Sequence, residues 1–191
     1  MAHLAVSLLG SFRVTLDESP LTTFATDKVR ALLAFLVVES DRPHRRETLT
    51  ALLWPDRPRS AARNSLRQSL YQLRKTLAES HNGAPHLLSS AKEIGFDPAS
   101  DYWLDVREHE ACLCAVRTHR RQGLGLCEEC LARLDTATEL YRGDFLAGFS
   151  LPHCPRFVWW QLTMQEACHR QAMEVLSILV NAYEEQQDYD R

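Results

Sequence analysis

Residues 60–77 carry a set of side chains that suits contact with a nucleic acid. Leucines recur every three or four residues, the spacing of one buried helix stripe, at Leu66, Leu70, Leu73 and Leu77. Roughly opposite this stripe on a helix of about 100° per residue lie Asn64, Gln68, Tyr71 and Lys75, flanked by Arg67 and Arg74. Arginine and lysine bind guanine edges, asparagine and glutamine bind adenine, and tyrosine holds phosphate or packs on a thymine methyl. No acidic residue occurs between Asp56 and Glu79, whereas a merely solvated helix face usually mixes Glu with Lys.

Basic residues also surround this stretch. Those near the starts of two expected helices would suit phosphates: Arg45, Arg46, Arg57, Arg59 and Arg63. Residues 42–75 hold nine basic and two acidic side chains, although the whole chain has a net charge of −3. Residues 1–97 sum to +3 and residues 98–191 to −6, which favours a polyanionic partner for the first half alone. The alternative is a chance cluster of arginines on a wet surface.

The elements that would position this face follow a recognisable order. The sequence predicts two short strands at 3–8 and 11–16, followed by two helices at 26–40 and 44–54. The stretch at 60–77 is a third helix, capped by Ser60, and a hairpin follows at 86–96. Strands, three helices and a hairpin make an α+β winged helix-turn-helix. In that fold the third helix enters the major groove and the hairpin, or wing, touches the flanking backbone.

The second half reads as helices throughout, at about 104–119, 127–142, 157–170 and 171–185. Successive helix pairs of this size indicate an all-α array similar to tetratricopeptide (TPR) repeats. We therefore divide the chain into a winged-helix domain, residues 1–100, and a TPR-like helical domain, residues 101–191. The last residues, QQDYDR, resemble the turn between two repeat helices, so a further helix is expected to follow.

Six cysteines fall in the second half, and four residues there have the types and spacing of a zinc site. Cys127 and Cys130 form a C-x-x-C pair, and His119 with Cys114 would complete a tetrahedral structural site, with Cys112 as the substitute for Cys114. The alternative is that these cysteines are small buried apolar residues. A redox role finds no support at this level, because no neighbour in the sequence obviously lowers a thiol pKa.

Several functional classes lack their signatures. The chain contains no GxGxxG, GxxxxGK[ST], GxSxG or HExxH motif, and we expect no enzyme activity. Its apolar runs are too short to span a membrane. The N-terminus lacks a basic region and a cleavage site, so we read it as a strand and expect a cytoplasmic protein.

The quoted stretches resemble a known family. Five segments are similar to the OmpR-type winged helix of SARP-type transcriptional activators: LLGSFRV, KVRALLAFL, ETLTALLWPD, ARNSLRQSLYQLRK and YWLDV. Three later segments are similar to the bacterial transcriptional activator domain (BTAD) that follows that winged helix: LYRGDFLAGF, PRFVWW and AYEEQQDYDR. The resemblance implies a sequence-specific activator that binds double-stranded DNA and contacts RNA polymerase. It gives the recognition role to Arg63, Asn64, Arg67, Gln68, Tyr71, Arg74 and Lys75, and the wing role to Ser89, Ser90 and Lys92. The resemblance implies further BTAD helices at the C-terminal end, so we expect the BTAD to be truncated in this sequence.

A second function remains open at this stage. The helical half is expected to contact a second copy of the chain or RNA polymerase, since helical repeats bind proteins. The whole chain could therefore be a protein-interaction module with little or no DNA binding. Salt separates the two hypotheses, because binding through several phosphates weakens steeply as salt rises.

Overall fold

The computed structural model describes residues 3–77, 85–123 and 125–185. The chain divides into two compact units. Unit 1 comprises residues 1–6, 13–104 and 149–162, and unit 2 comprises residues 7–12, 105–148 and 163–191. No helix within the described ranges combines the length and the apolar character that a membrane crossing needs.

Unit 1 contains two small sheets. The first has the strand order β3-β2-β1-β7, from Ser19–Pro20, Arg13–Leu16, Leu4–Ser7 and Tyr102–Leu104. In it β1 and β7 run parallel, with Leu4 opposite Tyr102. The second has the order β4-β6-β5, from His44–Arg45, Glu93–Phe96 and Leu87–Ser89, and both of its pairings are antiparallel. The β5–β6 hairpin is the expected wing.

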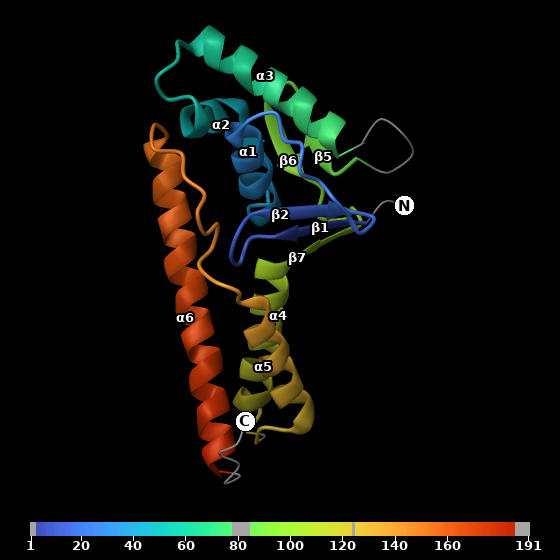
Figure 1. The fold of residues 1–191 in the computed structure, drawn as a ribbon, viewed down its shortest axis with the longest axis vertical. Helices are drawn as coiled ribbons and strands as arrows, with labels where there is room; N and C mark the ends of the chain where they lie inside the picture. Colours follow the sequence, from blue (N-terminus) through green and yellow to red (C-terminus); the bar gives the residue numbers. More distant parts are fainter. Residues whose placement is uncertain (1–2, 78–84, 124, 186–191) are drawn as a thin grey trace. The chain divides into compact units, whose positions relative to one another are not determined.

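Three helices pack against these sheets: α1 (Asp27–Val38), α2 (Arg46–Leu53) and α3 (Arg59–Thr76). Figure 1 shows α3 lying beside the β5–β6 hairpin, with α2 and α1 next to it. Their leucines form a shared core in which Leu33, Leu53 and Leu73 have no exposed surface. Burying about ten such side chains, at about 1.5–3 kcal/mol each, is the main stabilisation of the unit.

Unit 2 is helical. Helices α4 (Asp105–Arg121) and α5 (Glu128–Leu140) lie side by side and share a core with the later part of α6 (Pro155–Glu185). Leu113 of α4, Leu134 of α5 and Val175 of α6 are buried in that core. Asp105 starts α4 with its carboxylate fully buried, where it accepts hydrogen bonds from the backbone N–H groups of Leu8 and Leu9. Burial raises the pKa of Asp105, and these hydrogen bonds oppose that rise.

Three details differ from the sequence-based expectations. The helices predicted at 157–170 and 171–185 are one continuous helix, α6, because no glycine or proline interrupts residues 156–185. Helix α3 begins at Arg59 after the N-cap Pro58, so Ser60 lies inside the helix and does not cap it. The start of the predicted second helix instead forms β4, which pairs with β6. The turn expected at 186–191 lies outside the described residues.

Candidate nucleic-acid interface

Helix α3 has the amphipathic character that its sequence predicts. Leu66, Leu70 and Leu73 are at most 4% exposed and face the core of unit 1. The exposed side chains on the opposite face are Arg63, Asn64, Arg67, Gln68, Tyr71 and Lys75. Tyr71 is 66% exposed, so its ring and hydroxyl are open to a partner on this face. Arg74 is half-buried at the edge of the stripe.

Glu47 of α2 pairs with two of the predicted cations, and the sequence alone did not indicate this carboxylate. Arg63 donates a hydrogen bond of 2.8 Å to Glu47 Oε1, and Arg59 approaches the same oxygen at 3.5 Å. The bond from Arg63 is the largest cause that lowers the pKa of Glu47. The carboxylate keeps both guanidinium groups at the start of α3 and offsets part of their charge. Arg59 and Arg63 are therefore less available to phosphates than Arg67.

The wing is tied to the start of α2 by a further arginine. Arg46 donates from Nε to the carbonyl of Ser90 at 3.0 Å and from a terminal nitrogen to Ser89 Oγ at 2.9 Å. This places the side chain of Arg46 against the hairpin, while Arg45 and Lys92 are exposed. A hollow of about 320 Å³ lies between α2, α3 and the hairpin, with Arg46, Arg63 and Arg67 on its walls. One flank of α3 thus presents a positively charged concavity.

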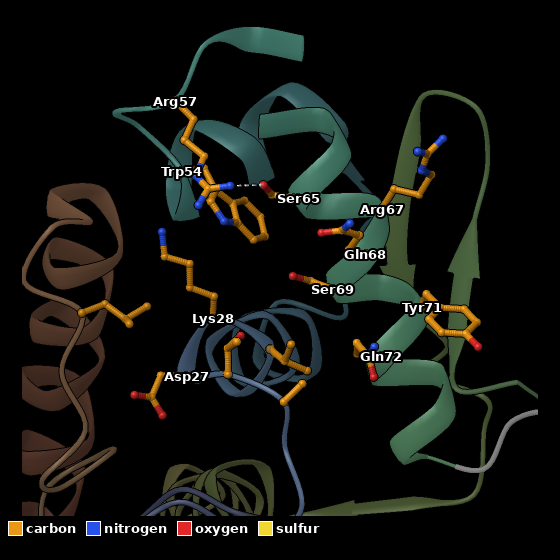
Figure 2. A pocket seen from close by; sticks show the side chains of 14 residues that line it. Asp27, Lys28, Trp54, Arg57, Ser65, Arg67, Gln68, Ser69, Tyr71 and Gln72 are labelled. Carbon is orange, nitrogen blue, oxygen red and sulfur yellow. Dashed lines mark hydrogen bonds between the residues drawn. The ribbon is translucent and has the colours of Figure 1, made fainter. Parts of the chain in front are cut away.

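A larger hollow, of about 1050 Å³, lies on the other flank of α3 and is bounded by the start of α1 (Figure 2). The Lys28 ammonium sits 5.5 Å from the centre of the Trp54 ring, a cation–π arrangement that fixes its position. Arg57, which is exposed in the α2–α3 loop, donates to Ser65 Oγ at 2.8 Å. Figure 2 shows Gln68 extending toward this hollow.

Lys28 was missed by the sequence analysis, because only the packing of α1 against Trp54 brings it beside α3. Asp27 also borders the hollow, but its carboxylate is paired with Arg30 at 3.2 Å. Lys28 and Arg57 therefore add two positive charges across α3 from the wing. Figure 2 shows Arg67 and Tyr71 on the side of α3 toward the hairpin.

A second group of functional side chains lies in unit 2, where α4 ends and α5 begins. One ligand atom each of His119, Cys127 and Cys130 lies within 4.8 Å of the others, an arrangement that could hold a metal ion. Cys127 is the N-cap of α5, and its Sγ lies 3.4 Å from that of Cys130. The Nε2 atom of His119 lies 3.0 Å from the carbonyl oxygen of Gly125, which positions the ring beside the two thiols.

The other two predicted ligands lie outside this group. Cys114 is five residues before His119 on α4, so its side chain points about 140° away around the helix. Cys112 shares the face of His119 but lies about 10 Å back along the axis. It is buried in the helical core, 4% exposed. Three of the predicted ligands are brought together, and the fourth is not.

The environments of the two close thiols differ. The pKa of Cys127 is lowered mainly by a hydrogen bond from the backbone N–H of Cys130. The hydrogen bond with the Cys130 thiol is the second cause that lowers it. Burial raises the pKa of Cys130. The sequence could not reveal the first effect, because it depends on Cys127 occupying the N-cap position, where free N–H groups point at its sulfur. Burial also raises the pKa of Cys168, to about 12.

Comparison with known proteins identifies the first of these regions. Residues 22–97 match the family "Transcriptional regulatory protein, C terminal". The chain is 39% identical over 152 residues to the transcriptional regulatory protein EmbR of Mycobacterium bovis and of Mycobacterium tuberculosis, covering 75% of this chain and 36% of each relative. It therefore spans about a third of the length of these relatives.

A solved structure extends the likeness of the fold. The structure "Mycobacterium tuberculosis EmbR in complex with low affinity phosphopeptide" superposes with a TM-score of 0.74 and 24% identity, over 98% of this chain and 47% of that one. The agreement covers the winged helix and the helices that follow it. The chain carries an OmpR-type winged-helix domain of the transcriptional regulatory protein C-terminal family, followed by a helical region, and is homologous to the EmbR regulators.

Proposed function

We propose that this chain is the DNA-binding part of a sequence-specific transcriptional activator, in which α3 enters the major groove of double-stranded DNA. The observation that carries the proposal is the exposed face of α3, where amide, guanidinium and phenol groups stand opposite a fully buried leucine stripe. We assign the N-terminal winged helix, residues 1–100, to DNA and the BTAD, residues 101–191, to protein contacts. Bacterial DNA is cytoplasmic, so we place the protein in the cytoplasm.

The residues divide into two roles. Those on the exposed face of α3 are assigned to base edges: Asn64, Arg67, Gln68, Tyr71 and Lys75, with Arg74 at the margin. Arginine pairs in bidentate fashion with guanine, and asparagine or glutamine with adenine. The remaining cations are assigned to phosphates: Arg45, Arg46, Arg57, Arg59, Arg63 and Lys92, together with Lys28. A helix in the major groove has one DNA backbone on each side, and the two positively charged flanks of α3 would each meet one of them.

Lys28→Ala and Lys92→Ala, on opposite flanks of α3, are expected to weaken binding to every DNA sequence by a similar factor. Each change removes one phosphate contact, so the slope of log K against log salt should become shallower by about one. Fluorescence anisotropy at several salt concentrations, with one preferred and one unrelated duplex, measures both quantities.

Arg13→Ala is the control, because Arg13 is exposed on β2 and lines neither of the two hollows beside α3. It should leave the salt slope unchanged. A change in base preference in either lysine variant would contradict its assignment to the backbone. A wild-type chain whose DNA affinity hardly depends on salt would instead favour the alternative function, a protein-interaction module.

We propose that the helical region contacts a partner protein, either RNA polymerase or a second copy of the chain. Residues 98–191 carry a net charge of −6, which does not suit a direct contact with DNA. In unit 2, α6 presents Met173, Leu176 and Val180 to solvent, and each is more than 40% exposed. Exposed apolar side chains of this kind are typical of a helical surface that binds protein.

We propose further that His119, Cys127 and Cys130 hold a structural zinc ion. Thiolate and imidazole ligands suit zinc better than harder metals, and such an ion would fasten the end of α4 to the start of α5. Cys114 as the fourth ligand stays a prediction, with Cys112 as its substitute.

Elemental analysis of the purified chain is expected to find about one zinc per chain, and Cys127→Ala should reduce this to near zero because it removes a thiolate ligand. Cys114→Ala is the matched variant. Loss of zinc there would make Cys114 the fourth ligand, and retention would indicate that the fourth ligand comes from elsewhere. A metal-free wild-type chain with unchanged thermal stability after zinc addition would rule the zinc proposal out.

A further inference from the structure

We propose that Cys127 and Cys130 form a thiol–disulfide exchange site that reacts with low-molecular-weight disulfides and closes into a reversible intrachain disulfide. The inference goes beyond DNA binding and does not require a bound metal. It shares its two thiols with the proposed zinc site, so metal and disulfide exclude each other.

The distance between the sulfurs carries the proposal. The two Sγ atoms are 3.4 Å apart, and a disulfide bond is about 2.05 Å long. A small side-chain rotation therefore brings them to bonding distance. Cys127 has extended backbone dihedrals at the N-cap, and Cys130 lies in the first turn of α5. This is the position in which a C-x-x-C pair can form a disulfide without disturbing the rest of its helix.

Exposure gives the two thiols different roles. Cys127 is exposed at the start of α5, so a small disulfide can reach it, whereas Cys130 is only 4% exposed. The outer thiol is therefore the one that attacks, and the inner thiol is the one that resolves. Cys112, Cys154 and Cys168 are buried, which shields them from the same reagent. Cys114 is exposed on α4 but belongs to no C-x-x-C pair.

The reaction balances without any other redox partner. The Cys127 thiolate attacks one sulfur of R–S–S–R, the S–S bond breaks, and one R–S⁻ leaves to take up a proton. The Cys130 thiol then loses its proton to solvent and its sulfur attacks Cys127 Sγ, which expels the second R–S⁻. Two protein thiols have given up two protons and two electrons, and the external disulfide has become two thiols.

Closure of this disulfide would change what unit 2 can bind. It removes both thiolate ligands beside His119, so a bound zinc ion is released as the disulfide forms. It also fixes Cys130, which packs in the core shared by α4, α5 and α6. The redox state of the surrounding thiol pool would thus decide whether the end of α4 is joined to α5 by a metal.

The test uses the full reduced chain, metal-free and zinc-loaded, treated with oxidised glutathione and quenched by alkylation. Intact mass and peptide mapping of the metal-free chain should show the loss of two hydrogens and protection of Cys127 and Cys130 together. The zinc-loaded chain should release about one zinc per disulfide, detected with a chromogenic chelator. A dithiol reductant should reverse both changes.

Three variants assign the roles. Cys130→Ser should stop at the mixed disulfide between Cys127 and glutathione. Cys127→Ser should leave Cys130 unmodified, and Cys114→Ser should close the Cys127–Cys130 disulfide as the wild type does. Circular dichroism checks that Cys130→Ser remains folded, and if it does not, peptide mapping of the wild type still decides. A metal-free wild type in which Cys127 and Cys130 stay unlinked would overturn this inference. Disulfide closure in a chain that binds no zinc would instead overturn the zinc proposal alone.

Discussion

Arg67→Ala is expected to remove the preference of the chain for one base pair of its target sequence while leaving its weak binding to unrelated DNA nearly intact. Arg67 is exposed on the outer face of α3, and among the residues that the structure describes no carboxylate pairs with it in the way that Glu47 pairs with Arg63. A bidentate pair with guanine contributes about 1–3 kcal/mol of discrimination, so affinity for the preferred duplex should fall about 5- to 150-fold. Competition binding between a preferred and an unrelated duplex measures the ratio directly.

Two companion variants make this prediction specific. Gln68→Ala should relax the preference at a different base position, because its amide occupies the next position along α3. Arg13→Ala, on β2 and outside both flanks of α3, should change neither affinity nor preference. An Arg67→Ala chain that keeps its site preference would show that α3 does not read the bases through this side chain.

Leu70→Asp is expected to unfold unit 1. Leu70 is 4% exposed in the middle of the buried stripe, so the substitution removes core contacts and places a carboxylate on the face of α3 that packs into the core. The loss of a buried leucine side chain alone costs about 2–5 kcal/mol, and burying an unpaired charge adds to this. The sum is comparable with the whole stability of a small domain, about 5–15 kcal/mol.

Circular dichroism at 222 nm should show a large loss of helical signal and of the cooperative melt that belongs to unit 1. Tyr71→Asp is the matched control, because it puts the same charge one residue further along α3, at a side chain that is 66% exposed. That variant should melt like the wild type. If Leu70→Asp also melts like the wild type, the stripe is not the buried face of α3.

Much of unit 1 could be predicted because its signals are local. The period of Leu66, Leu70 and Leu73 placed the buried face of α3 correctly, and the apolar run of α1 predicted a helix close to its observed bounds. The two strands of the wing, separated by Ser90, Ala91 and Lys92, also lie close to where the sequence predicts. Each of these features depends on residues fewer than about twenty apart in the chain.

Features that depend on distant partners were missed. Strand β4 is two residues long and exists because His44 pairs with Ile94, fifty positions later. Lys28 and Glu47 join the surface around α3 only through the packing of α1 and α2. The division of α6 into two helices was a different kind of error, since the sequence between Arg156 and Glu185 contains no residue that would break a helix.

Three of the four predicted metal ligands lie together, because their placement depends on local spacing in the sequence. The C-x-x-C spacing places both thiols at one helix end, and the loop before α5 returns the chain to His119. The sequence offered Cys114 or Cys112 as the fourth ligand, although five residues on a helix turn the side chain of Cys114 away from His119. Helical geometry could have shown this once the bounds of α4 were known.

We propose above that α3 reads a DNA sequence. The most direct test is to incubate the purified chain with a random pool of duplex DNA at two salt concentrations and to sequence what is retained. We expect enrichment of a short motif, with total retention falling steeply as salt rises. Retention with no enriched motif, or no retention even at low salt, would contradict the claim and favour a winged helix that serves protein contacts.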